Sequence, residues 1–138
     1  MTARQIHIFR IAFLLYIALV MYLCFGHFSQ SSPIQPQLLG IPTDKIAHFL
    51  MFLPFPVLAF FAFDKYSENF WSSAGYSFLT FLAGALLAAG TELGQAFLTD
   101  YRSGDPADFR ADLIGLAAGT LAIFILDLRK QRRHEKNA

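Results

Sequence analysis

Four long stretches of this sequence contain no Asp, Glu, Lys or Arg. They run over residues 11–43, 46–63, 69–91 and 113–126. A helix that crosses a membrane needs about 20 mainly apolar residues, with a range of about 17–25. The first three stretches contain apolar runs of that length. They therefore predict three membrane-spanning helices rather than the buried hairpin of a soluble protein.

The fourth stretch is shorter, and its helix must begin before the apolar run. Asp105 has the side chain of an N-cap residue, and Pro106 suits the first helical position, where no N–H is needed. Asp108 then falls at the third position, as in a variant of the capping box. A helix over residues 106–128 would be about 35 Å long, which is enough to cross a membrane.

We therefore predict an all-α fold, an integral membrane bundle of four transmembrane helices. The spans lie at about 8–28, 45–63, 70–96 and 106–128, in one domain whose basic tail covers 129–138. The first run follows basic residues, as a signal peptide does, but no A-x-A site follows it, so we expect it to be retained as a span.

The connections between the spans carry further signals. Pro54 and Pro56 should kink or break the second helix, and neighbouring groups must then bond its freed carbonyls. The short connection at 64–69 predicts an antiparallel pair formed by the second and third spans. The polar, proline-bearing segment Ser29–Pro42 predicts an irregular loop on the outer side.

The composition supports a membrane protein. Hydrophobic residues make up 55% of the 138 positions and charged residues 15%, whereas soluble domains have about 25% charged residues. This length allows one domain. The net charge of +1 predicts no nucleic-acid partner. Cys24 is the single cysteine, which excludes an internal disulfide.

The Lys and Arg residues predict the orientation, because they concentrate on the cytoplasmic side of membranes. Only Lys45, Arg102 and Arg110 lie in the two loops opposite the chain ends, and the other eight lie in the N-terminal segment, the middle loop and the tail. An even number of spans places both termini on one side. We therefore predict cytoplasmic N and C termini, with the basic tail against anionic lipid headgroups.

Polar residues gather at the predicted outer ends of spans two, three and four. Helical spacing places each group on one face of its helix. The groups are Lys45 and His48, then Glu92 and Gln95, then Asp105, Asp108 and Asp112.

Small residues continue the acidic faces into the membrane. Gly115 and Gly119 follow Asp112 at helical spacing, and Ala88 and Gly84 precede Glu92. Small residues let helices approach closely in a bilayer, and charged side chains there usually face the bundle interior. We therefore expect the acidic faces of spans three and four to point at each other, with Glu92 and Asp112 inside.

Three sequence blocks carry this pattern in order. They are Asp44-Lys45-x-x-His48-Phe49, Glu92-x-x-Gln95 and Arg102-x-x-Asp105-x-x-Asp108-x-x-x-Asp112-x-x-Gly115-x-x-x-Gly119. Over residues 8–128 the chain resembles the VanZ-like family of small membrane proteins, whose founding member is associated with teicoplanin resistance. The resemblance implies a multi-pass protein of the bacterial inner membrane. The family usually has Asn at the position of Asp112, so this chain adds a negative charge.

Two readings remain open for most residues of the cluster. Glu92 either pairs with Lys45 or Arg102 to join helix ends, or serves as a ligand-facing acid or base. Arg102 either clamps its loop or binds a phosphate or carboxylate. The candidates for catalysis are Glu92, His48 and Asp108. The predicted ligand-binding residues are Lys45, His48, Glu92, Gln95, Arg102, Asp105, Asp108 and Asp112.

No cofactor is predicted, and no metal, because the spacing of these residues matches no metal-ligand signature. Three functions fit the sequence. The first is an envelope protein that binds a headgroup, a lipid-linked precursor or a glycopeptide at its outer face and alters antibiotic susceptibility. The second is a membrane enzyme that performs acid–base chemistry on a lipid-linked substrate. The third is a cation-coupled carrier, which would place acidic residues nearer the middle of the bilayer. Since G-x-x-x-G joins helices within one chain or between two, the oligomeric state stays open.

Overall fold

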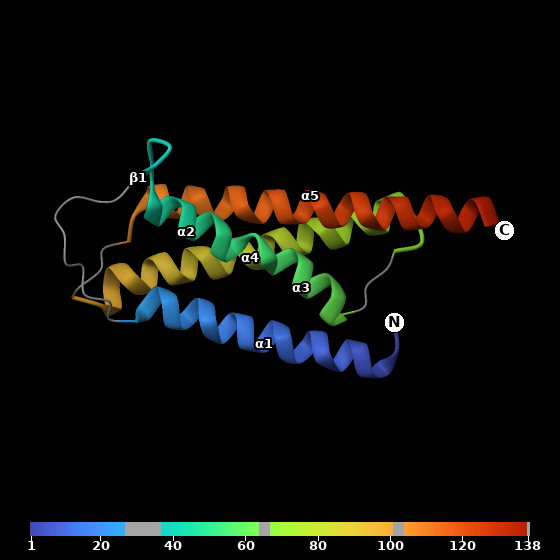
Figure 1. Cartoon of the computed structure of the whole chain (residues 1–138), viewed down its shortest axis with the longest axis horizontal. Coiled ribbons are helices and arrows are strands. Elements are labelled where there is room, and N and C mark those ends of the chain that lie inside the picture. The colour runs from blue at the N-terminus through green and yellow to red at the C-terminus, as the bar shows by residue number, and fades with distance from the viewer. Residues whose placement is uncertain (27–36, 64–66, 101–103, 138) are drawn as a thin grey trace.

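The computed structural model describes residues 1–26, 37–63, 67–100 and 104–137, with side chains up to residue 133. The helices are α1 (Ala3–Phe25), α2 (Thr43–Phe52), α3 (Pro54–Phe63), α4 (Phe70–Leu98) and α5 (Pro106–Asn137). They run up and down in one bundle, and both chain ends lie at the same end of it (Figure 1). Counting α2 and α3 as one span, four helices are long and apolar enough to cross a membrane, as predicted.

The boundaries differ from the predicted ones at three places. The first span begins and ends earlier, at Ala3–Phe25, and the second is two helices. The last helix continues through the basic tail to Asn137 instead of ending near residue 128. Part of the segment Ser29–Pro42, for which the sequence predicts an irregular loop, forms a minimal antiparallel hairpin of β1 (Gln37–Leu38) and β2 (Ile41–Pro42). Its turn residues Leu39 and Gly40 have positive φ angles, as tight hairpin turns require.

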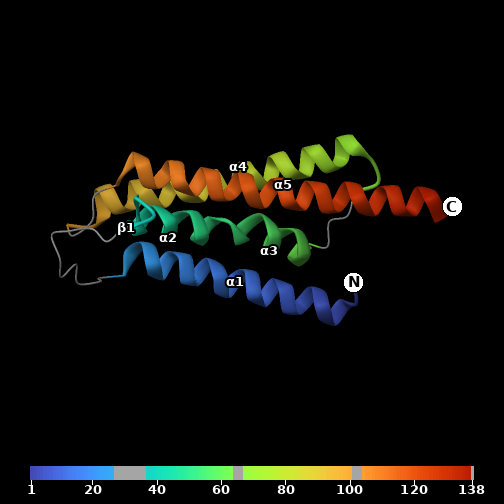
Figure 2. The same ribbon diagram turned by 45° about the horizontal axis from the view of Figure 1, so that its top comes forward.

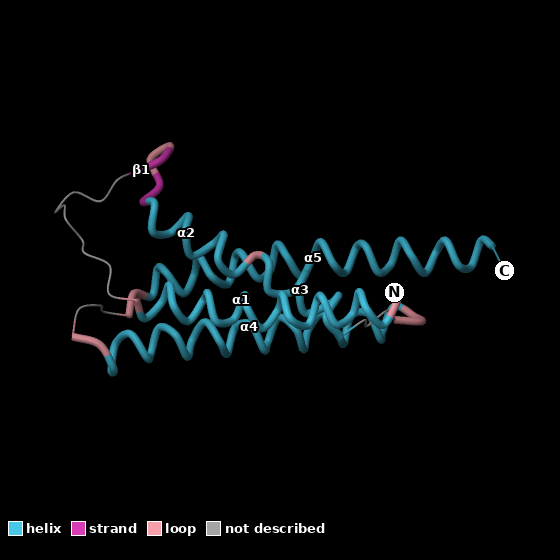
Figure 3. Tube along the Cα trace, turned by 60° about the horizontal axis from the view of Figure 1, so that its bottom comes forward, coloured by secondary structure: helices cyan, strands magenta, loops and turns pink. Residues whose placement is uncertain are grey.

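The prolines break the second span at Leu53, as predicted. Pro54 begins α3, and the short loop between the two helices is visible in Figure 3. The Tyr16 hydroxyl of α1 donates a 2.6 Å hydrogen bond to the Met51 carbonyl beside the break. A neighbouring helix thus supplies a hydrogen bond to the backbone at the break, a role that water cannot fill inside a bilayer.

The glycines of α5 lie against this break and not against α4. A Cβ on Gly115 would collide with the Phe49 carbonyl oxygen, and one on Gly119 would collide with the Leu53 carbonyl oxygen. The expectation that these glycines face α4 is therefore wrong, although Glu92 and Asp112 do lie inside the bundle. Helical spacing defines a face of a helix but does not say which neighbour occupies it.

The core lies where α1, the broken span, α4 and α5 meet. Its buried members are Val20, Cys24, Phe52, Phe55, Ala88 and Leu116. Gly84 of α4 brings that helix against the side chains of Leu116 and Phe55. Large apolar side chains cover the outer surface of all spans, as expected where lipid is the solvent. Figure 2 shows α1 along one side of the bundle, where it packs mainly on α3.

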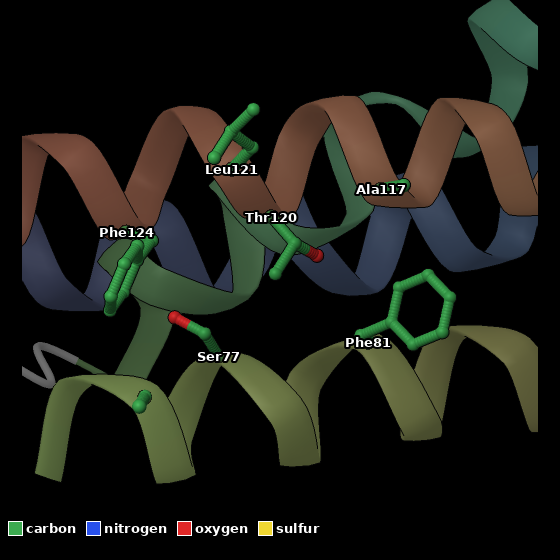
Figure 4. Close-up of a pocket in the computed structure, with 7 residues that line it drawn as sticks. Ser77, Phe81, Ala117, Thr120, Leu121 and Phe124 are labelled. Atoms are coloured by element: carbon green, nitrogen blue, oxygen red, sulfur yellow. The ribbon is translucent and has the colours of Figure 1, made fainter. Parts of the chain in front are cut away.

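A shallow groove of about 370 Å³ separates α4 from α5 in the middle of the bundle (Figure 4). Phe81, Leu121 and Phe124 are its large apolar side chains, and Ser77 and Thr120 are its hydroxyl-bearing side chains. No charged side chain lines it. An apolar groove in the membrane-spanning part of the molecule suits a lipid acyl chain, so we place the polar chemistry elsewhere.

The glycine contacts predict which positions reject a methyl group. Gly115→Ala and Gly119→Ala should each lower stability by about 1–3 kcal/mol, since the added carbon meets backbone that cannot rotate away. Gly90→Ala is the matched control, because Gly90 is an exposed glycine of α4 with open space at its Cβ. Thermal unfolding in detergent, read as the monodisperse fraction after heating, measures the difference. Equal melting of Gly115→Ala and Gly90→Ala would contradict the close approach.

Candidate functional site

The site is built where three helix ends meet at the end of the bundle opposite the chain termini (Figure 1). The start of α2 carries Lys45 and His48, the end of α4 carries Glu92, and the start of α5 carries Asp108 and Asp112. We call these five residues, together with Asp105, the polar cluster. Six of the eight predicted ligand-binding residues thus come together. Gln95 bonds elsewhere, and Arg102 lies outside the described residues.

The start of α5 explains the position of its carboxylates. Asp105 caps the helix as predicted, because its Oδ1 accepts the Ala107 N–H at 2.8 Å. The expected capping box is not formed. Asp108 bonds to Lys45 instead, and the Asp105 N–H donates to Glu92 Oε2 at 2.8 Å. In a capping box these two groups, the Asp108 side chain and the Asp105 N–H, would bond to each other. Here they bond to α2 and α4 instead.

Gly104 permits that connection. A Cβ at this position would press into the Glu92 carbonyl oxygen and against Ala96. The absence of a side chain therefore lets the loop lie directly on the last turns of α4. Only then can the backbone N–H of Asp105 reach the Glu92 carboxylate.

Lys45 forms the rim of the polar cluster. Its ammonium bonds to Asp108 Oδ1 at 2.5 Å, Asp105 Oδ2 at 2.6 Å and Asp44 Oδ2 at 3.2 Å. The Lys45 ammonium lowers the pKa of Asp105, with help from the Ala107 N–H. Lys45 thus pairs with three aspartates and not with Glu92, which was one of the alternatives that the sequence left open, and Asp44 is a partner that spacing alone did not identify.

His48 and Asp112 form the buried centre of the polar cluster. His48 Nδ1 lies 2.9 Å from Asp112 Oδ1, and Asp112 is 0% exposed. When Nδ1 donates this hydrogen bond, Nε2 presents a lone pair on the opposite side of the ring. That side faces Asp108, whose Oδ2 lies 3.6 Å from Nε2.

Glu92 completes this centre from α4. Its Oε2 accepts the Asp105 N–H, while its Oε1 is buried and has no hydrogen-bond partner among the described residues. This free oxygen lies 3.9 Å from His48 Nδ1. Asp112 Oδ2 is likewise buried without a partner there. A buried carboxylate oxygen without a partner costs folding free energy. Such oxygens are common where a ligand is bound.

Gln95 lies one turn beyond Glu92 and joins α4 to α1. Its side-chain amide donates to the Cys24 carbonyl at 2.8 Å, near the end of α1. The structure thus gives this predicted ligand-binding residue a helix-joining bond.

Sequence reasoning missed a second buried carboxylate at the other end of the bundle. Asp127 is 2% exposed, accepts the Ser67 N–H at 3.2 Å and accepts the Ser73 hydroxyl at 2.8 Å. A signal was present, because Asp127 lies three helical turns after the core residue Leu116 and so shares its face. Both oxygens of Asp127 are bonded, which distinguishes it from Glu92 and Asp112.

The arrangement offers two kinds of chemistry. An oriented imidazole beside carboxylates suits proton transfer. One nitrogen or oxygen atom from each of His48, Glu92 and Asp108 also lies within 4.8 Å of the others, as in the ligand set of a metal ion. Spacing did not predict this set because its members come from three separate helices.

Comparison with known proteins agrees with the resemblance of the three sequence blocks. The family model described as VanZ/LLP1 matches residues 13–127, which include every residue of the polar cluster. No curated protein and no solved structure matches the chain. Since the family model covers more than four-fifths of the sequence, this membrane protein belongs to the VanZ/LLP1 family.

Proposed function

We propose that this protein is a cell-envelope protein of the bacterial inner membrane. Its polar cluster binds a polar group at the outer face of that membrane. The ligand would be a lipid headgroup, the head of a lipid-linked precursor or a glycopeptide. The observation that carries the proposal is the layering of the cluster. Lys45 and Asp105 form a partly exposed rim, and buried Glu92 retains a free oxygen beneath it.

The balance of charge favours a particular kind of ligand. The polar cluster holds four carboxylates and one ammonium, that of Lys45, which bonds to two of the four, those of Asp105 and Asp108. Such a site repels a bare phosphate but attracts amines, and its oxygens accept hydrogen bonds from hydroxyl and amide groups. Amino sugars, peptides and amine-bearing headgroups offer these groups.

The basic residues support an outward orientation of the polar cluster. Arg10 bonds to the Ala62 carbonyl near the end of α3, and Arg129 and Arg133 line a cavity with Phe60 at that same end. This end lies opposite the polar cluster (Figure 1). Because positive residues favour the cytoplasmic side, where anionic lipids attract them, we infer cytoplasmic termini.

Labelling of an introduced cysteine tests this orientation. Leu39→Cys places a thiol in the hairpin turn, where the native side chain is 95% exposed, and Arg132→Cys places one in the C-terminal part of α5. A membrane-impermeant maleimide added to intact spheroplasts should label the first variant but not the second. The wild-type chain is the control that should remain unlabelled, because its Cys24 is buried. The reverse labelling pattern would refute the orientation and, with it, ligand capture from outside.

Replacement of one carboxylate tests the binding function. Glu92→Gln should weaken ligand binding about ten- to a hundredfold, because a hydrogen bond to a charged group contributes about 1.5–3 kcal/mol. In a glycopeptide-sensitive host, the wild-type chain should raise the inhibitory concentration of teicoplanin, and Glu92→Gln should return it to the level of the empty vector. Lipid-linked precursor pools, measured by mass spectrometry, should change in parallel.

The control for that experiment is Glu68→Gln. It makes the same chemical change at an exposed position before α4, at the opposite end of the bundle. This control should behave as wild type. Equal teicoplanin susceptibility and equal precursor pools for wild type and Glu92→Gln, at matched expression, would remove the basis of the proposal.

A second candidate function is acid–base catalysis on a lipid-linked substrate. The observation that favours it is the 2.9 Å bond from His48 to Asp112, which would hold the imidazole in one orientation. Catalysis differs from binding in one measurable way. Purified protein would convert the lipid-linked precursor with turnover. Full activity of both His48→Ala and Glu92→Gln would exclude it. The carrier hypothesis gains less support, since the polar cluster lies at helix ends.

A further inference from the structure

Three side chains capable of binding a metal ion converge beneath Lys45. They are His48 of α2, Glu92 of α4 and Asp108 of α5, and one ligand atom from each lies within 4.8 Å of the others. The separation of His48 Nε2 from Asp108 Oδ2 is 3.6 Å. Two ligand atoms of one tetrahedral zinc ion lie about 3.4 Å apart, given bond lengths of about 2.1 Å. The His48–Asp108 pair therefore already lies near ligand spacing, and the ligand atom of Glu92 lies within 4.8 Å of both.

The free oxygen of Glu92 points to a missing partner. Glu92 is only 8% exposed, and its Oε2 is held by the Asp105 N–H, which fixes the carboxylate. Its Oε1 is buried, unpartnered among the described residues and 3.9 Å from Nδ1 of His48, on the edge of the ring that also meets Asp112. No donor in the described part of the chain satisfies this oxygen, and a bound cation would do so.

Asp112 adds the support that metal-binding histidines usually have. Its Oδ1 lies 2.9 Å from His48 Nδ1 and accepts a hydrogen bond when that nitrogen carries the proton, and Asp112 is itself fully buried. A carboxylate on one ring nitrogen fixes the tautomer, orients the ring and leaves the other nitrogen for the metal. Here the other nitrogen is the one that faces Asp108.

The charges also favour a cation. Lys45 is bonded to Asp108 Oδ1 and leaves Oδ2 available, and it does not contact Glu92 or Asp112. Among the described residues, no ammonium therefore lies on the buried carboxylates of Glu92 and Asp112. Protonated His48 would neutralise part of this charge without a metal, and that is the alternative the experiment must separate.

We propose that His48, Glu92 and Asp108 bind a divalent transition-metal ion such as Zn²⁺, oriented by Asp112. One imidazole and two carboxylates suit zinc or manganese better than Ca²⁺, which prefers oxygen ligands alone, or Cu⁺, which prefers sulfur. Three protein ligands leave a fourth position for water or for an oxygen of a ligand. Metal binding goes beyond the proposed headgroup binding and does not depend on it.

Metal content of the purified full-length chain tests the proposal. The tag-free protein in detergent is stripped with EDTA, loaded with Zn²⁺ and measured by inductively coupled plasma mass spectrometry. We expect about one Zn²⁺ per chain, and a cobalt-substituted sample should show d–d absorption of nitrogen and oxygen ligation. Absence of both signals in folded wild-type protein would overturn the proposal, because protonated His48 would then account for the site.

Matched variants locate the ion. Glu92→Gln and Asp108→Asn should weaken Zn²⁺ binding at least about tenfold, and Asp112→Asn should weaken it less, as removal of an orienting group does. Asp127→Asn is the control, since it alters a buried carboxylate at the other end of the bundle. Wild-type affinity in Glu92→Gln, or an equal loss in Asp127→Asn, would overturn the assignment.

Lys45→Met keeps the test decisive even if the ligand variants fold poorly. Removal of the ammonium that lies 2.5 Å from Asp108 should tighten Zn²⁺ binding, and a misfolded chain cannot give that result. Unchanged or weaker binding would overturn the role of Asp108. Because no headgroup or glycopeptide is present in these measurements, loss of the metal proposal leaves the proposed binding function intact, and the reverse also holds.

Discussion

The close approach of the broken second span to the glycine face of α5 is the contact on which the rest of the structure depends. Gly115 and Gly119 let the backbone around Leu53 lie directly on α5. Within a bilayer, such contact between helices replaces the hydrophobic effect as the source of association. It also fixes α2 one turn further along, so that His48 meets Asp112. Packing in the apolar part of the bundle thus determines the geometry of its polar end.

The polar end obeys the rule that polar groups in a membrane must be satisfied within the protein. Lys45 bonds to three aspartates at the rim, and the N–H of Asp105 bonds to Glu92. These bonds link α2, α4 and α5 where the helices would otherwise separate. They leave Oε1 of Glu92 without a partner among the described residues, and the proposals for the polar cluster rest on this oxygen.

Much of the fold, and part of the candidate site, could be predicted from the sequence. The start of α5 at Pro106, the break before Pro54 and the burial of Glu92 and Asp112 all follow from local chemistry or helical spacing. The neighbours of these groups could not be read in this way. The residues that bond to Lys45 include one 63 positions away, and no periodic pattern relates α2 to α5 at that distance.

The sequence by itself determined the number of spans and the set of charged residues near one end of the bundle. These depend on apolar length, on capping chemistry and on the cost of exposing charge to lipid, which are properties of single helices. Only the tertiary structure decided that Gly115 faces the broken span and that His48, Glu92 and Asp108 form one group. The reason is that rotation of each helix about its axis is set by side chains and backbone on its neighbours.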